Sequence, residues 1–257
     1  LVKKLVIADQ IAINVNQVYS QNGMPGALDA LLAIYGFSVQ IYCDFSGYTD
    51  MAIGLALALG IKLPNNFARP YAASSLGDFW RRWHITLSFW LRDYLYKPLG
   101  GNRVGRSKEI RNVMITMTLG GLWHGASWTF VIWGMLHGIG VSIAHLAKFA
   151  FRRLPSGRIP SWIAVLMTFH FVTFAWVFFR ARTLDKAIEI LSAPFIGTWA
   201  GFGPFVTTNL FPLILIIVFF ALHRFDDNRR IKVAIRRARP EYGWPLILLA
   251  WIIAITV

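Results

Sequence analysis

The sequence is poor in cysteine and in charged residues. Cys43 is the one cysteine among 257 residues, which excludes an internal disulfide and a zinc cluster built on cysteines. It lies in an apolar run, so we interpret it as a small buried side chain rather than a nucleophile. Charged residues make up 15% of the chain, well below the roughly 25% that is typical of soluble domains. A soluble fold is therefore not expected.

Several motifs of soluble enzymes are also missing. The chain has no GxSxG, no Walker motif and no GxGxxG, which argues against serine-hydrolase, nucleotide and hydride chemistry. The histidines do not follow an HxxxH spacing, so we expect no metal site. No basic face carries spaced aromatic residues. We therefore assign the net charge of +14 to contact with the lipid bilayer and its anionic headgroups, and expect no nucleic-acid partner.

Long apolar segments dominate what is present, since 56% of the residues are hydrophobic. A helix that spans a bilayer needs about 20 mostly apolar residues. The fold class that follows is all-α, a polytopic transmembrane helical bundle with interfacial or re-entrant helices. The expected apolar helices are residues 27–43, 48–63, 112–123, 127–146, 160–179, 204–222 and a last segment from 243. The mixed segment 71–96 is placed at an interface or in a membrane dip.

We expect a single membrane domain over residues 1–257, with a core motif region at 37–138 and C-terminal helices at 159–257. The chain starts without Met and ends inside an apolar run, so we interpret it as a fragment of a longer protein. The basic run 224–239 is assigned to the cytoplasm, because cytoplasmic loops carry the excess of Lys and Arg. Alternation then places 148–158 on the same side and 180–203 outside.

Two histidines beside tryptophans are the candidates for chemistry. An imidazole at bilayer depth loses its hydration, so it requires partners or a function. His124, between Trp123 and Gly125, is suited to accept a hydroxyl proton because a neutral histidine has a pKa near 6.5. The alternative is a histidine that satisfies a helix break at Gly125.

His84 lies in the segment Trp80–Ser88. Helical spacing predicts Trp80 and Ser88 on its face, and the like charge of Arg81 and Arg82 is expected to lower its pKa. It is a candidate to orient a thioester, to bind an acceptor or to pair with His124. The alternative is an interfacial histidine capped by polar neighbours.

The remaining histidines are given supporting roles. His137 is expected to support the site or to pack between helices, and His145, His170 and His223 are interpreted as structural.

Three aspartates are interpreted as pairing residues. Asp44 and Asp50 lie between two apolar segments, where a carboxylate is costly unless paired. We expect them to pair with Arg81, Arg82 or Arg92, with a proton relay as the alternative. Asp78 is expected to cap a helix that starts near Ser74 or Ser75, or to pair with arginine.

Five ordered segments over about residues 3–138 resemble the membrane-bound O-acyltransferase (MBOAT) family. The resemblance is greatest to the C-terminal portion of its bacterial branch, which includes alginate O-acetyltransferase and the D-alanine transfer protein of teichoic acid synthesis. The segments are Gln40-Ile-Tyr-Cys-Asp-Phe-Ser-Gly-Tyr-Thr-Asp50-Met-Ala-Ile-Gly54, Leu63-Pro-Asn-Asn-Phe-Ala-Arg-Pro-Tyr71, Phe79-Trp-Arg-Arg-Trp-His-Ile-Thr86, Arg92-Asp-Tyr-Leu-Tyr-Lys-Pro-Leu-Gly-Gly-Asn-Arg103 and Gly120-Gly-Leu-Trp-His-Gly-Ala126. Family members carry further N-terminal helices, which this chain lacks.

The resemblance implies a ring of tilted helices around a tunnel. It also implies acyl transfer from a cytoplasmic thioester donor, acetyl-coenzyme A or another acyl thioester, with no bound cofactor. His124 takes the place of the family's essential histidine and His84 that of its second polar tunnel residue. Residues expected to line the acyl channel or to steady the oxyanion are Trp80, Trp83, Trp123, Ser88, Gly120 and Gly121.

The function that the resemblance implies is O-acetylation of an exported polysaccharide such as alginate. It further implies a bacterial cytoplasmic (inner) membrane protein with several spans, which works with an extracytoplasmic acetyltransferase partner. Lipid- or teichoic-acid-directed acyl transfer is the alternative within the family. A proton-coupled transporter is disfavoured, because two related halves with interrupted helices are not seen. A purely structural membrane scaffold is the remaining alternative.

Overall fold

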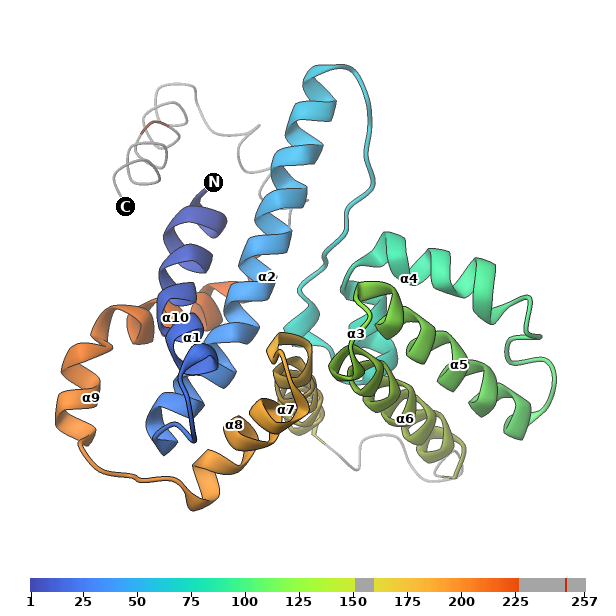
Figure 1. The fold of residues 1–257 in the computed structure, drawn as a ribbon. Coiled ribbons are helices and arrows are strands. Elements are labelled where there is room, and N and C mark those ends of the chain that lie inside the picture. Colours follow the sequence, from blue (N-terminus) through green and yellow to red (C-terminus); the bar gives the residue numbers. More distant parts are fainter. Residues whose placement is uncertain (151–159, 227–247, 249–257) are drawn as a thin grey trace. The chain divides into compact units, whose positions relative to one another are not determined.

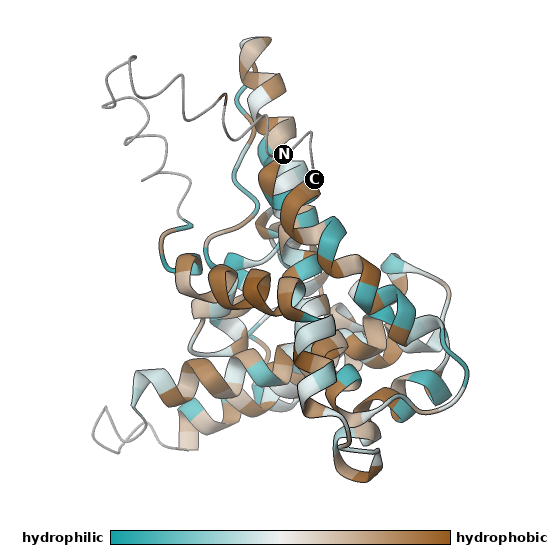
Figure 2. Ribbon diagram, turned by 90° about the vertical axis from the view of Figure 1, so that its left-hand side faces the viewer, coloured by the Kyte–Doolittle hydropathy of each residue, from teal (hydrophilic) through white to brown (hydrophobic). Residues whose placement is uncertain are grey.

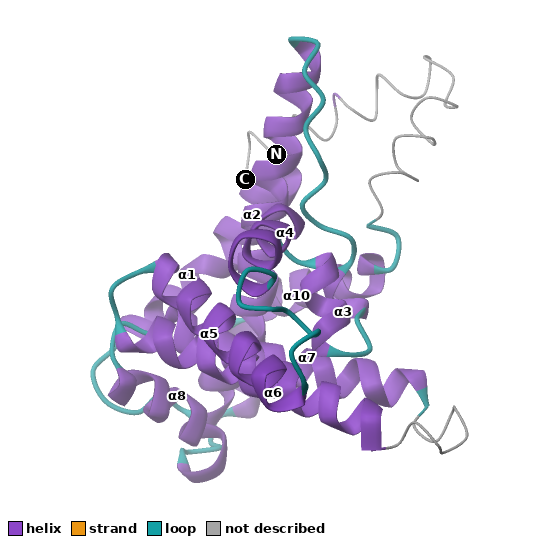
Figure 3. Ribbon diagram, turned by 90° about the vertical axis from the view of Figure 1, so that its right-hand side faces the viewer, coloured by secondary structure: helices purple, strands orange, loops and turns teal. Residues whose placement is uncertain are grey.

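The computed structural model describes residues 1–150 and 160–226, together with residue 248. Within these residues every regular element is a helix (Figure 3), which confirms the all-α class for this part of the chain. The contacts divide the chain into two compact units, one formed by Leu1–Arg69 with the described residues from Glu189 onward and the other by Pro70–Ile188. The single membrane domain expected over 1–257 stays a prediction.

The first unit is built around one long helix, α2, Ala27–Ala58. Helix α1 lies alongside it (Figure 1), and the absence of a side chain at Gly36 lets Ile11 and Val15 of α1 approach closely. The remaining elements of this unit are η1 Lys3–Ala8, α1 Asp9–Ser20, α9 Phe202–Thr208 and α10 Leu210–His223.

The prediction of two separate segments at 27–43 and 48–63 was wrong, because α2 runs through the junction without a break. No proline interrupts that stretch, and the charge of Asp44 has a partner. Lys4 Nζ lies 2.9 Å from the carboxylate of Asp44. The backbone of Lys4 approaches Gly47 so closely that an added Cβ would lie 3.3 Å from its nitrogen. The N-terminal segment therefore neutralises Asp44, the charged residue at which the sequence analysis ended the first apolar helix.

The single span expected at 204–222 is a bent pair. Helices α9 and α10 meet at Asn209 at an angle of 75°. The Asn209 side chain accepts a hydrogen bond from Asn14 Nδ2 at 2.7 Å and donates one to the Phe205 carbonyl at 3.0 Å. These bonds satisfy polar groups at the bend, so the break is compatible with an apolar surrounding.

The second unit contains the two histidine motifs. Its central pair is α5, Arg106–His124, and α6, Trp128–Ala150, which pack against each other as antiparallel neighbours (Figure 1). The expected mixed segment 71–96 is a series of short helices. The other elements of this unit are η2 Pro70–Ala72, α3 Leu76–Arg82, α4 Ile85–Leu91, η3 Arg92–Tyr96 and α7 Ser161–Arg180. Helix α8, Leu184–Ile196, joins the two units in sequence.

Three described helices, α2, α6 and α7, are long and apolar enough to span a membrane, and the bent pair α9–α10 is a fourth candidate. Hydrophobic residues, brown in Figure 2, recur along the helices of the described part of the chain. The chain is therefore a membrane protein with several candidate spans. The basic run at 224–239 lies outside the described residues beyond residue 226, and of the last expected segment only residue 248 is described.

Aromatic rings form the core of the second unit. Phe79 and Trp83 stack at 5.7 Å, and Trp133 and Trp176 stack at 5.5 Å. Trp83 and Trp176 connect the two stacks at 4.9 Å. Large rings bury much apolar area at a small loss of side-chain freedom, so this cluster holds α3, α6 and α7 together.

Candidate active site

His124 is the last residue of α5, at the turn into α6. Its ring lies among aromatic side chains of α6 and α7, with centroid distances of 5.4 Å to Trp133 and 5.0 Å to Phe179. A side chain at Gly125 would place Cβ 2.5 Å from the ring of Phe130. Glycine at this position therefore lets the turn close over the histidine.

His84 lies between α3 and α4 in the left-handed region, at φ 41° and ψ 57°. The prediction that helical spacing places Trp80 and Ser88 on its face was wrong, because the helix is broken at this residue. Positive φ is uncommon for residues other than glycine, and strained residues of this kind cluster at functional sites. Because of this break, the direction of the His84 side chain does not follow the helical spacing of α3 or of α4.

Both imidazoles have a lowered pKa. Burial, and to a smaller extent the like charge of the nearby His124, lower the pKa of His84 to about 4. Burial also lowers the pKa of His124. The sequence analysis attributed the shift at His84 to Arg81 and Arg82, whereas loss of water and the second histidine cause it. Both rings are neutral at pH 7 and able to accept a proton.

A small cavity adjoins His124. It has room for about one water molecule, and the surface of its lining residues is mostly apolar. Its lining residues are Trp80, Leu87, Leu91, Met117, Gly120, His124, Trp133, Gly134 and His137. His124, which is partly buried, thus borders a small apolar space.

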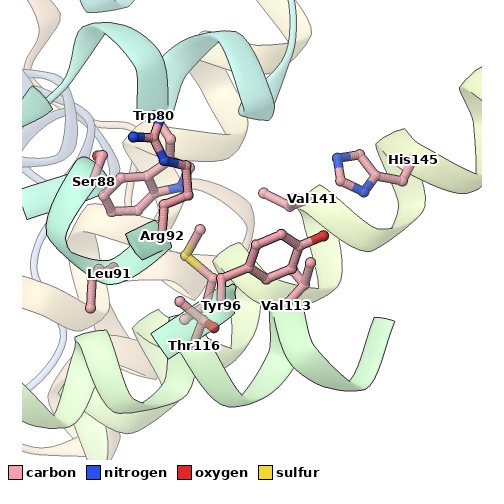
Figure 4. A pocket seen from close by; sticks show the side chains of 10 residues that line it. Trp80, Ser88, Leu91, Arg92, Tyr96, Val113, Thr116, Val141 and His145 are labelled. Carbon is pink, nitrogen blue, oxygen red and sulfur yellow. The ribbon is translucent and has the colours of Figure 1, made fainter. Parts of the chain in front are cut away.

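A larger apolar pocket of about 600 Å³ shares Trp80, Leu91 and Met117 with the small cavity. In the view of Figure 4, Trp80 and Arg92 lie toward one end and His145 lies toward the other. The complete lining is Trp80, Ser88, Leu91, Arg92, Tyr96, Val113, Thr116, Met117, Val141 and His145. The two spaces are therefore neighbours, with shared walls.

A third, more polar depression of about 930 Å³ begins at His145. Two basic residues line it, Arg106 at the start of α5 and Lys148 near the end of α6. At its junction with the apolar pocket, His145 Nδ1 lies 3.2 Å from the carboxylate of Glu109, which is also hydrogen-bonded to Tyr96. The three spaces are thus neighbours in a series, each sharing lining residues with the next, from the basic depression to the cavity at His124.

The residues expected to line a substrate channel fall into different environments. Trp80 and Gly120 line the cavity at His124, and Ser88 lines the larger pocket. Trp83 is buried in the aromatic core, whereas Trp123 is 65% exposed. Their roles in binding stay predictions.

Gly121 serves the contact between helices. It lies inside α5, where a Cβ would be 3.1 Å from the Cα of Gly134 on α6 and closer still to a carbonyl oxygen. A backbone N–H within a helix is already committed to the helix. The expected oxyanion role of Gly120 and Gly121 therefore has no free backbone donor to rest on.

Asp44 and Asp50 bond lysines of the N-terminal segment, not the arginines that the sequence analysis named. Lys4 Nζ lies 2.9 Å from Asp44, and Lys3 Nζ lies 3.1 Å from Asp50 and 2.9 Å from Asp226. Both lysines belong to η1, a helical segment that the hydropathy pattern did not predict.

The arginines have carboxylate partners in their own helices. Asp78 bonds Arg82 at 2.9 Å and Arg81 at 3.3 Å, and Ser75 caps the same helix by accepting from the Asp78 backbone N–H. Arg92 bonds Asp93 at 2.9 Å. These local ion pairs neutralise the charged side chains of the short helices α3 and η3, which also carry many apolar residues.

Sequence reasoning passed over several residues that the structure brings to the site. Trp133 and Phe179 contact His124, and Glu109 and Tyr96 meet His145. In the sequence these residues are distinguished only by lying in aromatic or basic segments, which does not indicate a place near either histidine. Among the described residues, no three histidine, cysteine, aspartate or glutamate side chains are grouped as metal ligands.

The described helices of this membrane protein place one partly buried histidine, His124, beside a small apolar cavity, and a second, His84, near enough to interact with it electrostatically. Residues 15–184 match the family described as MBOAT, the membrane-bound O-acyltransferases. The chain belongs to this family, which is a family of O-acyltransferases.

Relatives with different acceptors are similar to this chain. It is 48% identical over 191 residues to the peptidoglycan O-acetyltransferase of Helicobacter pylori, covering 74% of this chain and 36% of that protein. It is 42% identical over 236 residues to the probable alginate O-acetylase AlgI of Pseudomonas aeruginosa, covering 88% and 44%. It is 34% identical over 166 residues to the teichoic acid D-alanyltransferase of Bacillus subtilis, covering 60% and 42%. The chain spans less than half the length of these relatives.

Proposed function

We propose that this chain carries the catalytic centre of an enzyme that transfers an acetyl group from a thioester donor to a hydroxyl of an exported polysaccharide. The observation that carries the proposal is the placement of His124, a partly buried imidazole beside a small apolar cavity that shares three lining residues with a larger apolar pocket. Family membership supports acyl transfer as the reaction class.

In the proposed reaction His124 accepts the proton of the acceptor hydroxyl while the oxygen attacks the thioester carbonyl carbon. The tetrahedral intermediate then collapses, the carbon–sulfur bond breaks, and the protonated His124 returns the proton to the thiolate. His84, neutral at pH 7, is proposed to donate a hydrogen bond from its N–H to the carbonyl oxygen as negative charge develops. The enzyme itself forms no covalent intermediate.

The donor is proposed to be acetyl-coenzyme A or another acyl thioester that enters at the basic depression. Arg106 and Lys148 suit a donor with phosphate groups, and the apolar pocket suits the uncharged acyl end. Lys148 opens the segment 148–158, which the excess of positive charge assigns to the cytoplasm. A cytoplasmic donor and an acceptor on the opposite side fit this path.

The acceptor is proposed to be a glycan outside the cytoplasm. Alginate is one candidate, because relatives named alginate O-acetylases match up to 89% of this chain. Peptidoglycan is the second, since the H. pylori relative is 48% identical over the region that holds both histidines. Teichoic acid is supported by a lower identity of 34%.

The same proposal includes the ring of tilted helices around a tunnel and a place in the bacterial cytoplasmic membrane. It also includes an extracytoplasmic acetyltransferase as partner. The support for these is the family, the candidate spans and the bacterial relatives.

The test compares the full-length protein that contains this chain with its His124→Ala variant in its own host. We expect ester-linked acetate on the exported polysaccharide, or on peptidoglycan, to be lost while polymer export continues. Acetate would be measured after mild alkaline release, separately for the two glycan fractions, so that the result also assigns the acceptor.

The matched control is His170→Ala, since His170 lies on α7 of the same unit and bonds its own helix at the Leu166 carbonyl. This control is expected to keep full acetate. Equal membrane levels of all variants are checked by immunoblot. Undiminished acetate in His124→Ala would exclude His124 as the base.

A further inference from the structure

His137 on α6 is a completely buried histidine that the proposed reaction does not use. Its ring lies among aromatic rings, 4.9 Å from Trp133, 5.1 Å from Trp80 and 6.0 Å from Phe79. Neither ring nitrogen has a hydrogen-bond partner within the described residues. Leaving a buried polar atom unmatched costs about 1–3 kcal/mol. Phenylalanine would fill this position without that cost, so packing alone does not account for a histidine.

The unmatched nitrogens of His137 belong to the same cavity that His124 lines. Trp80 and Trp133 also line it, and their indole N–H groups likewise have no partner in the described part of the protein. Three side chains therefore bring four unmatched polar atoms to one enclosed space. The cavity has room for about one water, and although its lining surface is mostly apolar, these four atoms offer the two to four polar partners that an ordered buried water needs.

Trp133 packs between His124 and His137 and contacts both rings. Its ring lies edge to face with both, 5.4 Å from His124 and 4.9 Å from His137, and it stacks on Trp176 behind. His124, Trp133 and His137 also line the same cavity.

We propose that His137 is a positioning residue for His124, acting through a water held in this cavity. The non-reacting N–H of His124 and one indole N–H donate to the water oxygen. The water donates in turn to the unprotonated nitrogen of His137. This arrangement uses the donor and acceptor capacity of a single water without conflict.

The consequence for catalysis is the choice of tautomer, and this inference rests on the proposed acyl transfer. A histidine acts as a base only when its lone pair, not its N–H, faces the hydroxyl. A fixed acceptor on the other side of the ring selects that tautomer and supports the imidazolium that forms. His137 therefore supplies at a distance what a carboxylate supplies in other base-assisted sites.

The experiment uses the purified full-length protein in lipid nanodiscs, with acetyl-coenzyme A as the donor probe and the host's exported polysaccharide as the acceptor. The variants are His137→Phe, which keeps the ring, and His137→Asn and His137→Gln, which place an amide near one or the other ring nitrogen. Phe171→Leu is the packing control, because Phe171 contacts His137 at 5.8 Å but does not line the cavity. His124→Ala tests the reaction itself.

We expect His137→Phe to lower kcat roughly 10- to 100-fold, the usual range for removing an outer hydrogen-bond partner, while KM for the donor stays within about twofold. At least one amide variant should recover most of the loss, and Phe171→Leu should keep kcat. A merely structural role predicts instead that Phe171→Leu and His137→Phe change together and that no amide rescues.

Full kcat in His137→Phe, or a loss that neither amide recovers, would overturn the inference. If His137→Phe does not fold, kcat is compared between the two amide variants and Phe171→Leu. Losses of kcat in both amide variants that match the loss in Phe171→Leu would then overturn the inference. Failure of the proposed function is seen separately, because His124→Ala would then retain turnover of acetyl-coenzyme A.

Discussion

At the scale of single residues, the two histidines of the motifs differ in how the backbone presents them. His124 ends a regular helix, whereas His84 occupies a left-handed conformation between two short helices. The sequence analysis identified both residues from their tryptophan neighbours. It did not identify the helix break, because the residues around His84 have ordinary helix propensity and only tertiary contacts with the aromatic core favour the bend.

The pH dependence of transfer follows from the lowered pKa of His124. The base works only when neutral, and burial moves its protonation to lower pH. We therefore expect the acid limb of kcat/KM to have its midpoint below 6.5, so that activity persists at pH 6 and is lost in stronger acid. Donor turnover measured from pH 4 to 8 checks this, with His170→Ala as a control that keeps the same limb. A midpoint at or above 6.5 would contradict the buried environment.

At the scale of elements, the packing of α5 on α6 depends on glycine. We expect Gly121→Ala to lower the free energy of unfolding by about 1–3 kcal/mol, because its Cβ meets backbone atoms of α6 that cannot move aside. The same substitution at Gly54 of α2, which meets no atom within 4 Å, should be neutral or stabilise by up to about 1 kcal/mol. Thermal unfolding of both variants in detergent measures the difference, and equal melting temperatures would refute it.

The N-terminal segment is held by a charged cluster. Lys3 bridges Asp50 and Asp226, and Asp226 also accepts a hydrogen bond from Tyr42 at 2.5 Å. We expect Lys3→Met to destabilise the protein by about 1–3 kcal/mol, less than for a fully buried pair because the lysine side chain is 25% exposed.

The matched control for that cluster is Lys4→Met. Lys4 bonds Asp9 and Asp44, whose side chains are 42% and 49% exposed, and exposed pairs contribute about 0–1 kcal/mol. Urea or thermal unfolding of the two variants gives the comparison. A greater loss of unfolding free energy for Lys4→Met than for Lys3→Met would show that the exposure of an ion pair does not determine its contribution to stability.

Hydropathy predicted which segments are helical but not how long each helix is. The pattern placed a boundary at Asp44, although Lys4 neutralises that aspartate from forty positions away and α2 continues. Conversely, the window over 204–222 is apolar throughout, and the bend at Asn209 depends on a hydrogen bond with Asn14. Long-range polar partners decide such boundaries, and a local pattern contains no information about them.

Much of the candidate site follows from the motifs, and the rest follows from the antiparallel pairing of α5 and α6. That pairing places Arg106 and Lys148 at one end and His124 at the other. Since α5 has 19 residues, the two ends are separated by about 27 Å at 1.5 Å per residue. The spacing of these residues in sequence gives no indication that they border neighbouring spaces.

At the scale of the whole molecule, the basic mouth should govern donor binding and not the chemical step. We expect Lys148→Glu to raise KM for acetyl-coenzyme A roughly tenfold, about 1.4 kcal/mol, with kcat unchanged and the effect reduced in high salt. The control is Lys62→Glu, the same charge change at a residue that does not line the mouth. Equal KM values for the two variants would exclude this route for the donor.

The contact of Gly121 with Gly134 has a consequence for how donor preference changes during evolution. Where two helices touch through their backbones, no side chain remains that mutation can shorten, so the part of the cavity lined by Gly134 cannot be enlarged in this way. Leu87 and Leu91 also line the cavity, and their side chains can be replaced by shorter ones. Enzymes of this kind that accept longer acyl chains should therefore differ on α4 and keep the glycine pair.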